Sequence, residues 1–493
     1  MIPYNQQTLA DIFSDCQNIL ENDKPEFLSL LERNINLNEI IPKSFYRNFY
    51  SWTGRPRKYP LVSFVWALII QKIFTIPTDL LLLTFLHYSK PLREFCGFDK
   101  VPDPSKITRF KQNFLSDLQS VFDKLVDITE PICQDIDSVK ADMTIFDSSG
   151  IEAWVKENNP KYANRIIKQL KSYKKSAGLS DSYDPYKVAY SSMPSSAATN
   201  PQIKQLYING HFCYVYKFGI VTNGLGIVRH IAFYNKDFFK AHPEIIINKK
   251  SDSPDEDKSV HDARLLIPTL QDFFKAHPLI NPKTFLGDSS FDAVGLYKSL
   301  LAGDTFGVDT FGKNRIFQRA YIPLNQRAGL ESLDYTINKD GIPCCPNNPE
   351  LPMKPESTSK LKSGIIRYKF VCPKMKWVRI VGKSKRRTSC DNPCTTSKCG
   401  RMVYVYPEKD LRAYPGTIRG TKDWDATYKI RCVAEQTINH FKENLCVGNR
   451  RTQNEKTIHA DLLIAGIAQL ISVVLADKIH KRQFIRSVKS LVA

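Results

Sequence analysis

Three acidic residues stand where their carboxylates can share metal ions. Asp147 ends a short apolar run, Asp288 ends another, and Glu435 lies within an amphipathic stretch. Hard cations such as Mg²⁺ take carboxylate oxygens as ligands and keep water and substrate phosphate as the others, so a few carboxylates suffice for two ions. Two such ions can activate the attacking oxygen and stabilise the leaving oxygen of an in-line phosphoryl transfer. Taken singly, each acid is explained equally well as an ordinary surface residue.

The stretch around Glu435 has the most specific spacing. Tyr428, Arg431, Glu435 and Lys442 are separated by gaps of two, three and six residues. On a regular α-helix these four side chains fall within an arc of roughly 60°. That face suits a metal-binding carboxylate flanked by Arg431 and Lys442, which would contact DNA phosphates. The alternative is a solvated helix with an i, i+4 ion pair, which contributes only about a few tenths of a kcal/mol.

Six of the twelve cysteines fall in one basic segment: Cys344, Cys345, Cys372, Cys390, Cys394 and Cys399. Four thiolates can hold a structural Zn²⁺ ion tetrahedrally, and the predicted ligands are Cys345, Cys372, Cys394 and Cys399. The spacing is looser than that of paired C-x₂-C ribbons, so unliganded thiols in a loop-rich insertion are the alternative. A zinc-stabilised module would grip DNA. Its Trp377 and Tyr368 would either stack on an unpaired base or form its core.

The apolar pattern predicts a mixed α/β sheet to position the aspartates. The order is strand, hairpin, helix, strand, helix. Strands are predicted at residues 144–147, 285–288 and 306–308, a hairpin turn at Asn223–Gly224, and a helix at residues 293–301. A turn is predicted directly after Asp147, at residues 148–150. The stretches 172–200 and 251–258 are predicted to be loops.

Four regions follow from these patterns. Residues 1–138 are predicted to be a helical DNA-binding domain, with helical apolar spacing at 63–74, 79–87 and 107–125. Residues 139–312 form the first part of the core, 313–419 a basic Cys-rich insertion, and 420–493 the C-terminal helices that complete the core, at about 424–445 and 457–478. Asp103 precedes Ile107–Lys111, a capped helix start carrying exposed basic residues. This segment fits either a DNA-binding helix-turn-helix or an ordinary helical bundle.

The formal charge of +20 over 493 residues predicts a polyanionic partner, either nucleic acid or an anionic membrane. The N-terminus shows no secretory signal, so we expect a cytoplasmic, nucleoid-associated protein with reduced cysteines. Two apolar stretches, Leu61–Leu86 and Leu462–Ala476, are predicted to be buried helices, because the first contains polar residues and the second is short for a bilayer.

The spacing Y-(2)-R-(3)-E-(6)-K resembles the signature around the third acid in bacterial insertion-sequence DDE transposases. The resemblance extends to Ile145–Ser149, which is similar to the family's first aspartate strand, and to Leu286–Asp292, which is similar to its second. The helical N-terminal region also resembles the family's DNA-binding domain, so the likeness covers most of the chain. It implies a ribonuclease-H-like fold, two Mg²⁺ ions with Mn²⁺ as a substitute, and cleavage of transposon ends followed by strand transfer.

Carried over by position, the resemblance implies that Asp147 bridges both ions, while Asp288 and Glu435 each share one. Tyr428, Arg431 and Lys442 are then DNA-binding residues. Asp142 and Asp292 are rival acids; Asp142 precedes the strand, and Asp292 is predicted to lie inside the following helix. The expected partner is double-stranded DNA, both transposon ends and target, bound by a homodimer. Two alternatives stay open: a nuclease of the same fold that does not join ends, and an inactive DNA-binding descendant of a transposase.

Overall fold

The computed structural model describes most of the chain in two compact units. The described ranges are 25–50, 55–180, 182–208, 211–245, 260–301, 317–325, 336–338, 340–361, 366–380, 382–406, 411–448 and 452–486, with scattered single positions near the ends and at 311. Unit 1 comprises residues 1–141, 147–261 and 433–493, and unit 2 comprises residues 142–146 and 262–432. The predicted strand at 306–308 and the predicted loop at 251–258 lie outside the described residues.

The N-terminal part of unit 1 is helical over its described residues, as predicted. Its helices are α2 (Glu26–Asn34), α3 (Leu37–Ile40), α4 (Lys43–Phe49), α5 (Leu61–Ile73), α6 (Asp79–Tyr88), α7 (Lys90–Cys96), α8 (Pro104–Asn113), α9 (Leu115–Ile136) and α10 (Ser138–Ala141). The Asp103 carboxylate caps α8 by accepting a hydrogen bond from the Ser105 amide. The single helix predicted at 107–125 is two helices that meet at Phe114.

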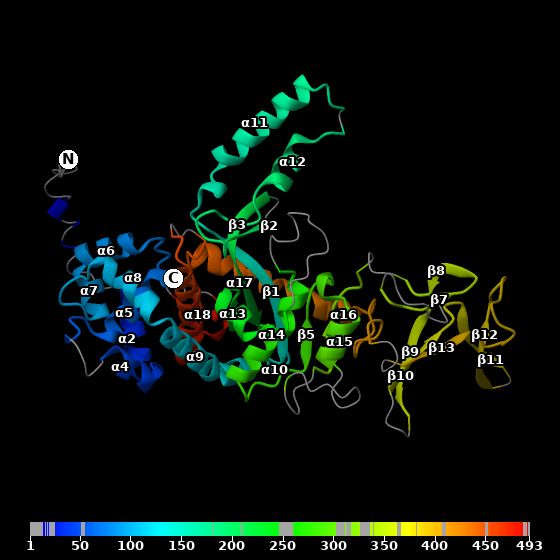
Figure 1. Ribbon diagram of the computed structural model, residues 1–493. Coiled ribbons are helices and arrows are strands. Elements are labelled where there is room, and N and C mark those ends of the chain that lie inside the picture. The colour runs from blue at the N-terminus through cyan, green and yellow to red at the C-terminus, as the bar shows by residue number, and fades with distance from the viewer. Residues whose placement is uncertain are drawn as a thin grey trace, which may run out of the picture. The chain divides into compact units, whose positions relative to one another are not determined.

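Helix α18 (Glu455–Lys478) is the central packing element of unit 1 (Figure 1). It packs against α9, α5, α8 and β4 (Val228–Phe233). A Cβ atom at Gly466 would lie 2.5 Å from Phe122 and 3.1 Å from Ile231, so glycine permits the close approach to both. By length and apolar composition α18 could cross a membrane, but a buried core helix passes the same test, and nearly all of α18 is buried.

A buried ionic cluster joins α18 to the N-terminal helices. Lys111 Nζ lies 2.7 Å from Asp79 and 2.9 Å from Asp461, and Lys72 Nζ lies 3.4 Å from Asp461. Both lysines and Asp461 are fully buried. Lys111 is therefore a structural residue, and the expectation that it is an exposed basic residue of α8 is wrong. Arg109, two residues earlier, is exposed as expected.

The two predicted apolar stretches, Leu61–Leu86 and Leu462–Ala476, are not buried to the same extent. Helix α5 is buried over almost its whole length, as is α18. Helix α6, the second part of the Leu61–Leu86 stretch, is only half buried, because Leu80, Phe85 and Tyr88 expose 67%, 44% and 65% of their surface. The prediction of a buried helix therefore holds for α5 and fails for the outer face of α6.

A six-stranded mixed sheet contains the first predicted aspartate strand. Its strands are β1 (Met143–Glu152), β2 (Lys204–Ile208), β3 (His211–Thr222), β4, β5 (Thr284–Leu286) and β6 (Arg319–Tyr321). The order is β2-β3-β1-β5-β6, with β4 paired to β3. Strands β2, β3 and β4 pair antiparallel, whereas β1, β5 and β6 pair parallel. The predicted hairpin at Asn223–Gly224 joins β3 and β4, and the Asn223 side chain accepts the amides of Leu225 and Ile227.

Four helices between β1 and β5 were not predicted from the sequence pattern. The stretch predicted as a loop at 172–200 contains the end of α11 (Pro160–Ser176) and all of α12 (Pro185–Ser192). Helix α13 spans Lys236–Ala241, and α14 spans Asp262–Ala276. The predicted helix after Asp288 is confirmed as α15 (Val294–Leu301). Strand β6 lies within the residues that were expected to belong to the insertion.

Unit 2 also contains a set of short strands, here called the β module, between Ile342 and Ile418. The strands are β7 (Cys344–Cys345), β8 (Asn348–Pro352), β9 (Lys354–Lys360), β10 (Ile366–Val371), β11 (Met375–Ile380), β12 (Lys383–Thr388) and β13 (Met402–Val405). They pair as β13-β10-β9, β11-β12 and β7-β8. Tyr368, Phe370 and Tyr414 form its core, whereas Trp377 is 60% exposed.

The helix predicted at 424–445 is a helical run whose pitch changes. It consists of α16 (Lys422–Tyr428), the 3₁₀ turn η4 (Lys429–Arg431), α17 (Cys432–Asn439) and the π-helical turn η5 (His440–Asn444). A 3₁₀ turn advances more per residue than an α-helix and a π turn advances less. The arc of roughly 60° expected for a regular helix therefore does not apply to this run.

Candidate active site

Asp147 and Asp288 each follow the segment in which the parallel strands β1 and β5 pair. Ile145 of β1 pairs with Leu286 of β5, and each aspartate follows its paired residue by two positions. Asp288 lies beyond the end of β5, as predicted. Asp147 does not end its strand, because β1 continues to Glu152, so the predicted turn at 148–150 is absent from β1. Gly150 instead permits a close approach to β3, since a Cβ atom there would lie 2.5 Å from Val215.

Local hydrogen bonds orient both aspartates in the same way. Asp147 Oδ1 accepts a hydrogen bond from the Ser148 amide at 2.9 Å, and Asp288 Oδ1 accepts one from the Ser290 amide at 2.8 Å. The Ser290 hydroxyl also donates to Asp288. Both carboxylates are half-buried, so each is only partly exposed to solvent. These hydrogen bonds engage one oxygen of each carboxylate with the neighbouring backbone.

Lys442 contacts the strand that carries Asp147. Its Nζ donates a hydrogen bond to Ser149 Oγ at 2.8 Å. Burial lowers the pKa of Lys442, and nearby groups, Cys213, Glu152, Glu443 and Asp147, act against that shift. Asp147 is thus close enough to interact electrostatically with the ammonium group. The sequence pattern did not single out Ser149 as a partner of Lys442.

Glu435 is exposed on α17, in the same unit as Asp147 and Lys442. The opposite side of α17 is anchored, since Val433, Ala434, Thr437 and Ile438 are buried. Thr437 Oγ1 donates to the Gly226 carbonyl at 3.0 Å, which holds α17 against the β3–β4 hairpin. A helix fixed on its inner side presents Glu435 from a stable backbone.

The other two signature residues, Tyr428 and Arg431, belong to unit 2. The Tyr428 ring stacks on Trp424 with centroids 4.9 Å apart, and Trp424 in turn contacts Tyr321 of β6 at 6.2 Å. Tyr428 therefore has a packing role at the edge of the sheet. Arg431 is half-buried in η4.

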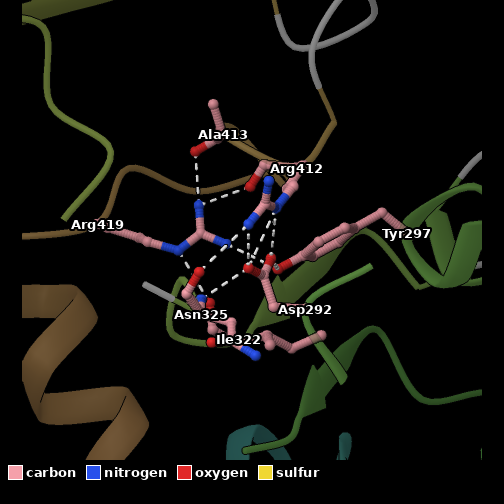
Figure 2. Close-up of polar contacts among 7 residues, drawn as sticks. All are labelled: Asp292, Tyr297, Ile322, Asn325, Arg412, Ala413 and Arg419. Carbon is pink, nitrogen blue, oxygen red and sulfur yellow. Dashed lines mark hydrogen bonds and ion pairs between the residues drawn. The ribbon is translucent and has the colours of Figure 1, made fainter. Parts of the chain in front are cut away.

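Asp292 is a structural residue, although not for the reason expected from the sequence. It lies between the 3₁₀ turn η2 (Ser289–Phe291) and α15, not inside the helix. Figure 2 shows its carboxylate enclosed by hydrogen-bond donors: Arg412 Nη2 at 2.8 Å, the Asn325 amide at 2.7 Å and the Tyr297 hydroxyl at 3.0 Å. Arg419 donates to the same Tyr297 oxygen at 2.8 Å. These bonds leave the Asp292 carboxylate occupied within the protein.

The second rival acid, Asp142, lies directly before β1, at the opposite end of the paired segment from Asp147. Its carbonyl oxygen accepts the amides of Lys283 and Thr284 at 3.1 and 3.3 Å, and its carboxylate lies 3.5 Å from Lys283 Nζ. These contacts fix the start of β1 beside β5. Asp142 thereby helps to set the register on which the Asp147 and Asp288 positions depend.

Four thiols of the β module line one small cavity of about 20 Å³: Cys345, Cys372, Cys390 and Cys394. Three of them, Cys345, Cys372 and Cys394, are predicted zinc ligands; Cys390 also lines the cavity, whereas Cys399, the fourth predicted ligand, does not. Burial raises the pKa of the Cys394 thiol, with the neighbouring Cys345 as the next cause. Among the described residues, no three Cys, His, Asp or Glu side chains are close enough to form a complete metal site as they stand.

A groove of about 1140 Å³ lies beside the far end of β1 in unit 1. One wall is the exposed face of α6, with Leu80 and Leu81, and the other is the segment Glu152–Pro160 that leaves β1. Trp154 lines the groove and is 60% exposed. Its carbonyl accepts a hydrogen bond from Gln453 at 2.8 Å, which fixes the backbone there.

A comparison with protein families finds a match in the N-terminal part of the chain. Residues 15–113 match the model of a family described as "Transposase domain (DUF772)". The matched part includes helices α2 to α8. It supports a transposase function in general terms, and with it an enzyme that processes DNA. No curated protein matches the chain.

Proposed function

We propose that this protein is a DDE-type DNA transposase of the bacterial insertion-sequence kind. The observation that carries the proposal is the register of β1 and β5, because Asp147 and Asp288 each follow the segment in which these parallel strands pair. The transposase-domain match in residues 15–113 supports it independently. A mixed sheet with these strands at its centre is also what a ribonuclease-H-like core requires.

Asp147, Asp288 and Glu435 would hold two Mg²⁺ ions, for which Mn²⁺ can substitute. Their chemistry fits, since all three are carboxylates and the two aspartates keep one oxygen bonded to a neighbouring amide. When bound, the ions would activate the attacking oxygen and stabilise the leaving oxygen of a phosphodiester. Lys442 would hold the Asp147 strand through Ser149, and Arg431 would position a phosphate. The substrate would be the terminal inverted repeats of the element, followed by target DNA.

The proposal also covers the domains, the oligomeric state, the location of the protein and the cysteines of the β module. Residues 1–138 would bind the transposon end, 139–312 and 420–493 would form the catalytic core, and 313–419 would form a basic insertion. The protein would act as a homodimer on DNA in the cytoplasm, at the nucleoid. In the β module, the four thiols that line one cavity, Cys345, Cys372, Cys390 and Cys394, would hold a structural Zn²⁺ ion. Cys399, the fourth residue chosen from the sequence, would be a free thiol.

The test uses the purified full chain and a duplex that carries the short inverted repeats flanking its reading frame. With Mg²⁺ we expect end cleavage and joining of the cut ends to a plasmid. Asp147→Asn, Asp288→Asn and Glu435→Gln should each abolish cleavage while end binding persists. Asp142→Asn, which removes the rival carboxylate before β1 and keeps the backbone carbonyl bonds to Lys283 and Thr284, should keep cleavage. Cutting without joining would indicate the nuclease alternative, and binding without any cutting would indicate an inactive descendant. Mg²⁺-dependent cleavage by a triad variant would overturn the assignment.

A further inference from the structure

Helices α11 and α12 form a projecting hairpin, here called the basic arm (residues 160–192). Figure 1 shows both helices side by side, extending away from β2 and β3 within unit 1. Lys171 of α11 donates a hydrogen bond to the Tyr186 hydroxyl of α12 at 2.7 Å. The arm follows β1 directly, so it begins thirteen residues after Asp147.

The base of the arm is rigidly attached to the sheet. Asn158 donates to the carbonyls of Ala153 and Tyr214 at 2.8 and 2.7 Å and accepts the Tyr214 amide at 2.7 Å. The next residue, Asn159, caps α11 by accepting the amide of Lys161 at 3.0 Å. Four hydrogen bonds around two asparagines therefore fix the start of α11, and two of them join it to Tyr214 of β3. A surface on α11 keeps a fixed direction relative to the strand that carries Asp147.

Helix α11 carries positive charge without compensation along its length. It contains six Lys and Arg residues and no Asp or Glu. Five of the six fall within an arc of roughly 120° at 100° per residue. These five are Lys161, Arg165, Lys168, Lys171 and Lys175. The helix therefore presents a basic stripe instead of the mixed charges that are usual on a solvated helix.

The five cations of this stripe are exposed, and Lys171 uses its ammonium group in the hydrogen bond to Tyr186. Lys161, Arg165, Lys168 and Lys175 are all exposed, and none forms an ion pair with a described residue. Arg165 lies over the Tyr162 ring at 5.7 Å, and Lys171 lies over the Tyr186 ring at 4.5 Å. Such aromatic contacts orient a cation but leave its charge available to a partner.

The other side of α11 is already covered. Ile167 is 6% exposed, and Ile166 and Leu170 are partly buried in a hairpin whose helices pack together. A helix that binds an anionic membrane needs a free apolar face beside its basic face. Because α12 packs against that face, the apolar surface that the arm leaves exposed is limited to tyrosines such as Tyr173 and Tyr186, which favours a rigid polyanion over a lipid surface.

We propose that the basic arm binds the phosphate backbone of duplex DNA, independently of base sequence, beside the Asp147 strand. From Lys161 to Lys175 the stripe is about 21 Å long, which matches roughly six base steps along one DNA strand. Lys and Arg side chains reach such phosphates as point charges or bidentate donors. The proposal deepens the proposed function, on which it rests for its DNA partner, by naming a contact surface outside the triad and the signature helix.

The test compares two full-length variants of equal net charge. The arm variant is Lys161→Gln/Arg165→Gln/Lys168→Gln/Lys175→Gln. The control variant, Lys236→Gln/Lys240→Gln/Lys275→Gln/Lys298→Gln, removes four exposed charges from α13, α14 and α15. Anisotropy with a labelled duplex of random sequence gives the Kd between about 50 and 200 mM salt. Circular dichroism checks that each variant keeps its helix content, and the pair Lys168→Gln/Lys175→Gln serves as a milder arm variant.

We expect the arm variant to bind at least tenfold more weakly than wild type, with a salt slope flatter by about three, and the control to bind nearly as wild type. Equal affinity of the arm variant and wild type, or equal weakening by the control, would overturn the proposal. So would arm-dependent binding to phosphatidylserine vesicles without any loss of DNA affinity. Mg²⁺-dependent cleavage by wild type is scored separately. If wild type cleaves DNA but the arm variant binds DNA as tightly as wild type, only the arm proposal is rejected. If DNA binding depends on the arm but wild type does not cleave, only the transposase proposal is rejected.

Discussion

The ammonium group of Lys442 donates a hydrogen bond to the Ser149 hydroxyl at 2.8 Å, two residues beyond Asp147 on β1. This bond joins the π-helical turn at the end of the signature helix to the central strand of the sheet. Lys442 is half-buried, and burial lowers its pKa. We therefore expect Lys442 to act mainly by fixing the position of the strand that carries Asp147, and less by contacting a partner in solvent.

Lys442→Gln should therefore reduce the cleavage rate of bound DNA more than it reduces DNA affinity. We expect at least a tenfold loss in single-turnover cleavage, because the Asp147 strand loses its cationic anchor. Ser149→Ala should reproduce part of the loss and should add little in the double variant, since both changes remove the same bond. A plain phosphate contact would behave differently: the salt slope of binding would fall by about 0.9 and cleavage at saturating protein would be unchanged.

Asp292→Ala should destabilise unit 2 without a direct effect on metal binding. The change leaves the buried Arg412 guanidinium without its carboxylate, which costs about 3–5 kcal/mol. Asp292→Ala/Arg412→Leu should recover part of that loss, as judged by urea unfolding. The matched control is Asp288→Asn, four residues earlier, which should change the unfolding midpoint little because only local hydrogen bonds are altered. Equal destabilisation by both variants would contradict these roles.

Lys111→Met should lower stability and leave DNA binding by the folded protein unchanged. The substitution deprives Asp79 and the buried Asp461 of their closest cation, at a cost of about 3–5 kcal/mol. Lys111→Met/Asp461→Leu should be less destabilised than the single variant. Arg109→Gln, on the exposed side of the same helix, should preserve the melting temperature. If Lys111→Met kept its melting temperature and bound DNA more weakly, the buried cluster would be the wrong description.

His459 predicts a loss of stability in mild acid. Both of its ring nitrogens are buried, its ring stacks on Phe233 at 4.8 Å, and burial lowers its pKa to about 4. The folded protein favours the neutral His459 ring. The contribution of this ring to stability is therefore fully present above the unfolded pKa of about 6.5 and is lost as the pH falls towards 4. The loss amounts to about 3 kcal/mol across that window. His459→Phe should remove this component of the pH dependence in melting curves, and an unchanged slope would refute it.

The β module should contain one zinc ion per chain in protein purified without chelator, measured by elemental analysis. Cys390→Ser should lose the ion, whereas Cys399→Ser should keep it, because only Cys390 lines the cavity with the other three thiols. Chelation should lower the melting temperature of wild type but not of Cys390→Ser. Retention of zinc by Cys390→Ser together with loss by Cys399→Ser would restore the ligand set predicted from spacing.

Much of the local structure could be predicted because it depends on periodic apolar positions and turn chemistry. Helices α5, α15 and α18, the Asn223–Gly224 hairpin and the cap of α8 by Asp103 all follow from interactions within a few residues. The signature spacing likewise located the helix that carries Glu435 and Lys442. The local prediction failed at residues 172–200, which were predicted to be a loop from their composition. This stretch contains the end of α11 and all of α12, and the eight residues of α12 are too few to show an apolar period.

By itself, the sequence determined the candidate acids, the helical N-terminal region and the mixed sheet. Only the tertiary structure decided which polar residues were structural. In the sequence, Lys111 and Asp292 look like ordinary exposed charged residues. Lys111 is buried beside Asp461 and Asp292 beside Arg412, and each partner lies more than a hundred positions away. The register of Ile145 with Leu286 and the bond from Lys442 to Ser149 are equally long-range. Such pairings depend on how distant segments pack, and no local pattern encodes that choice.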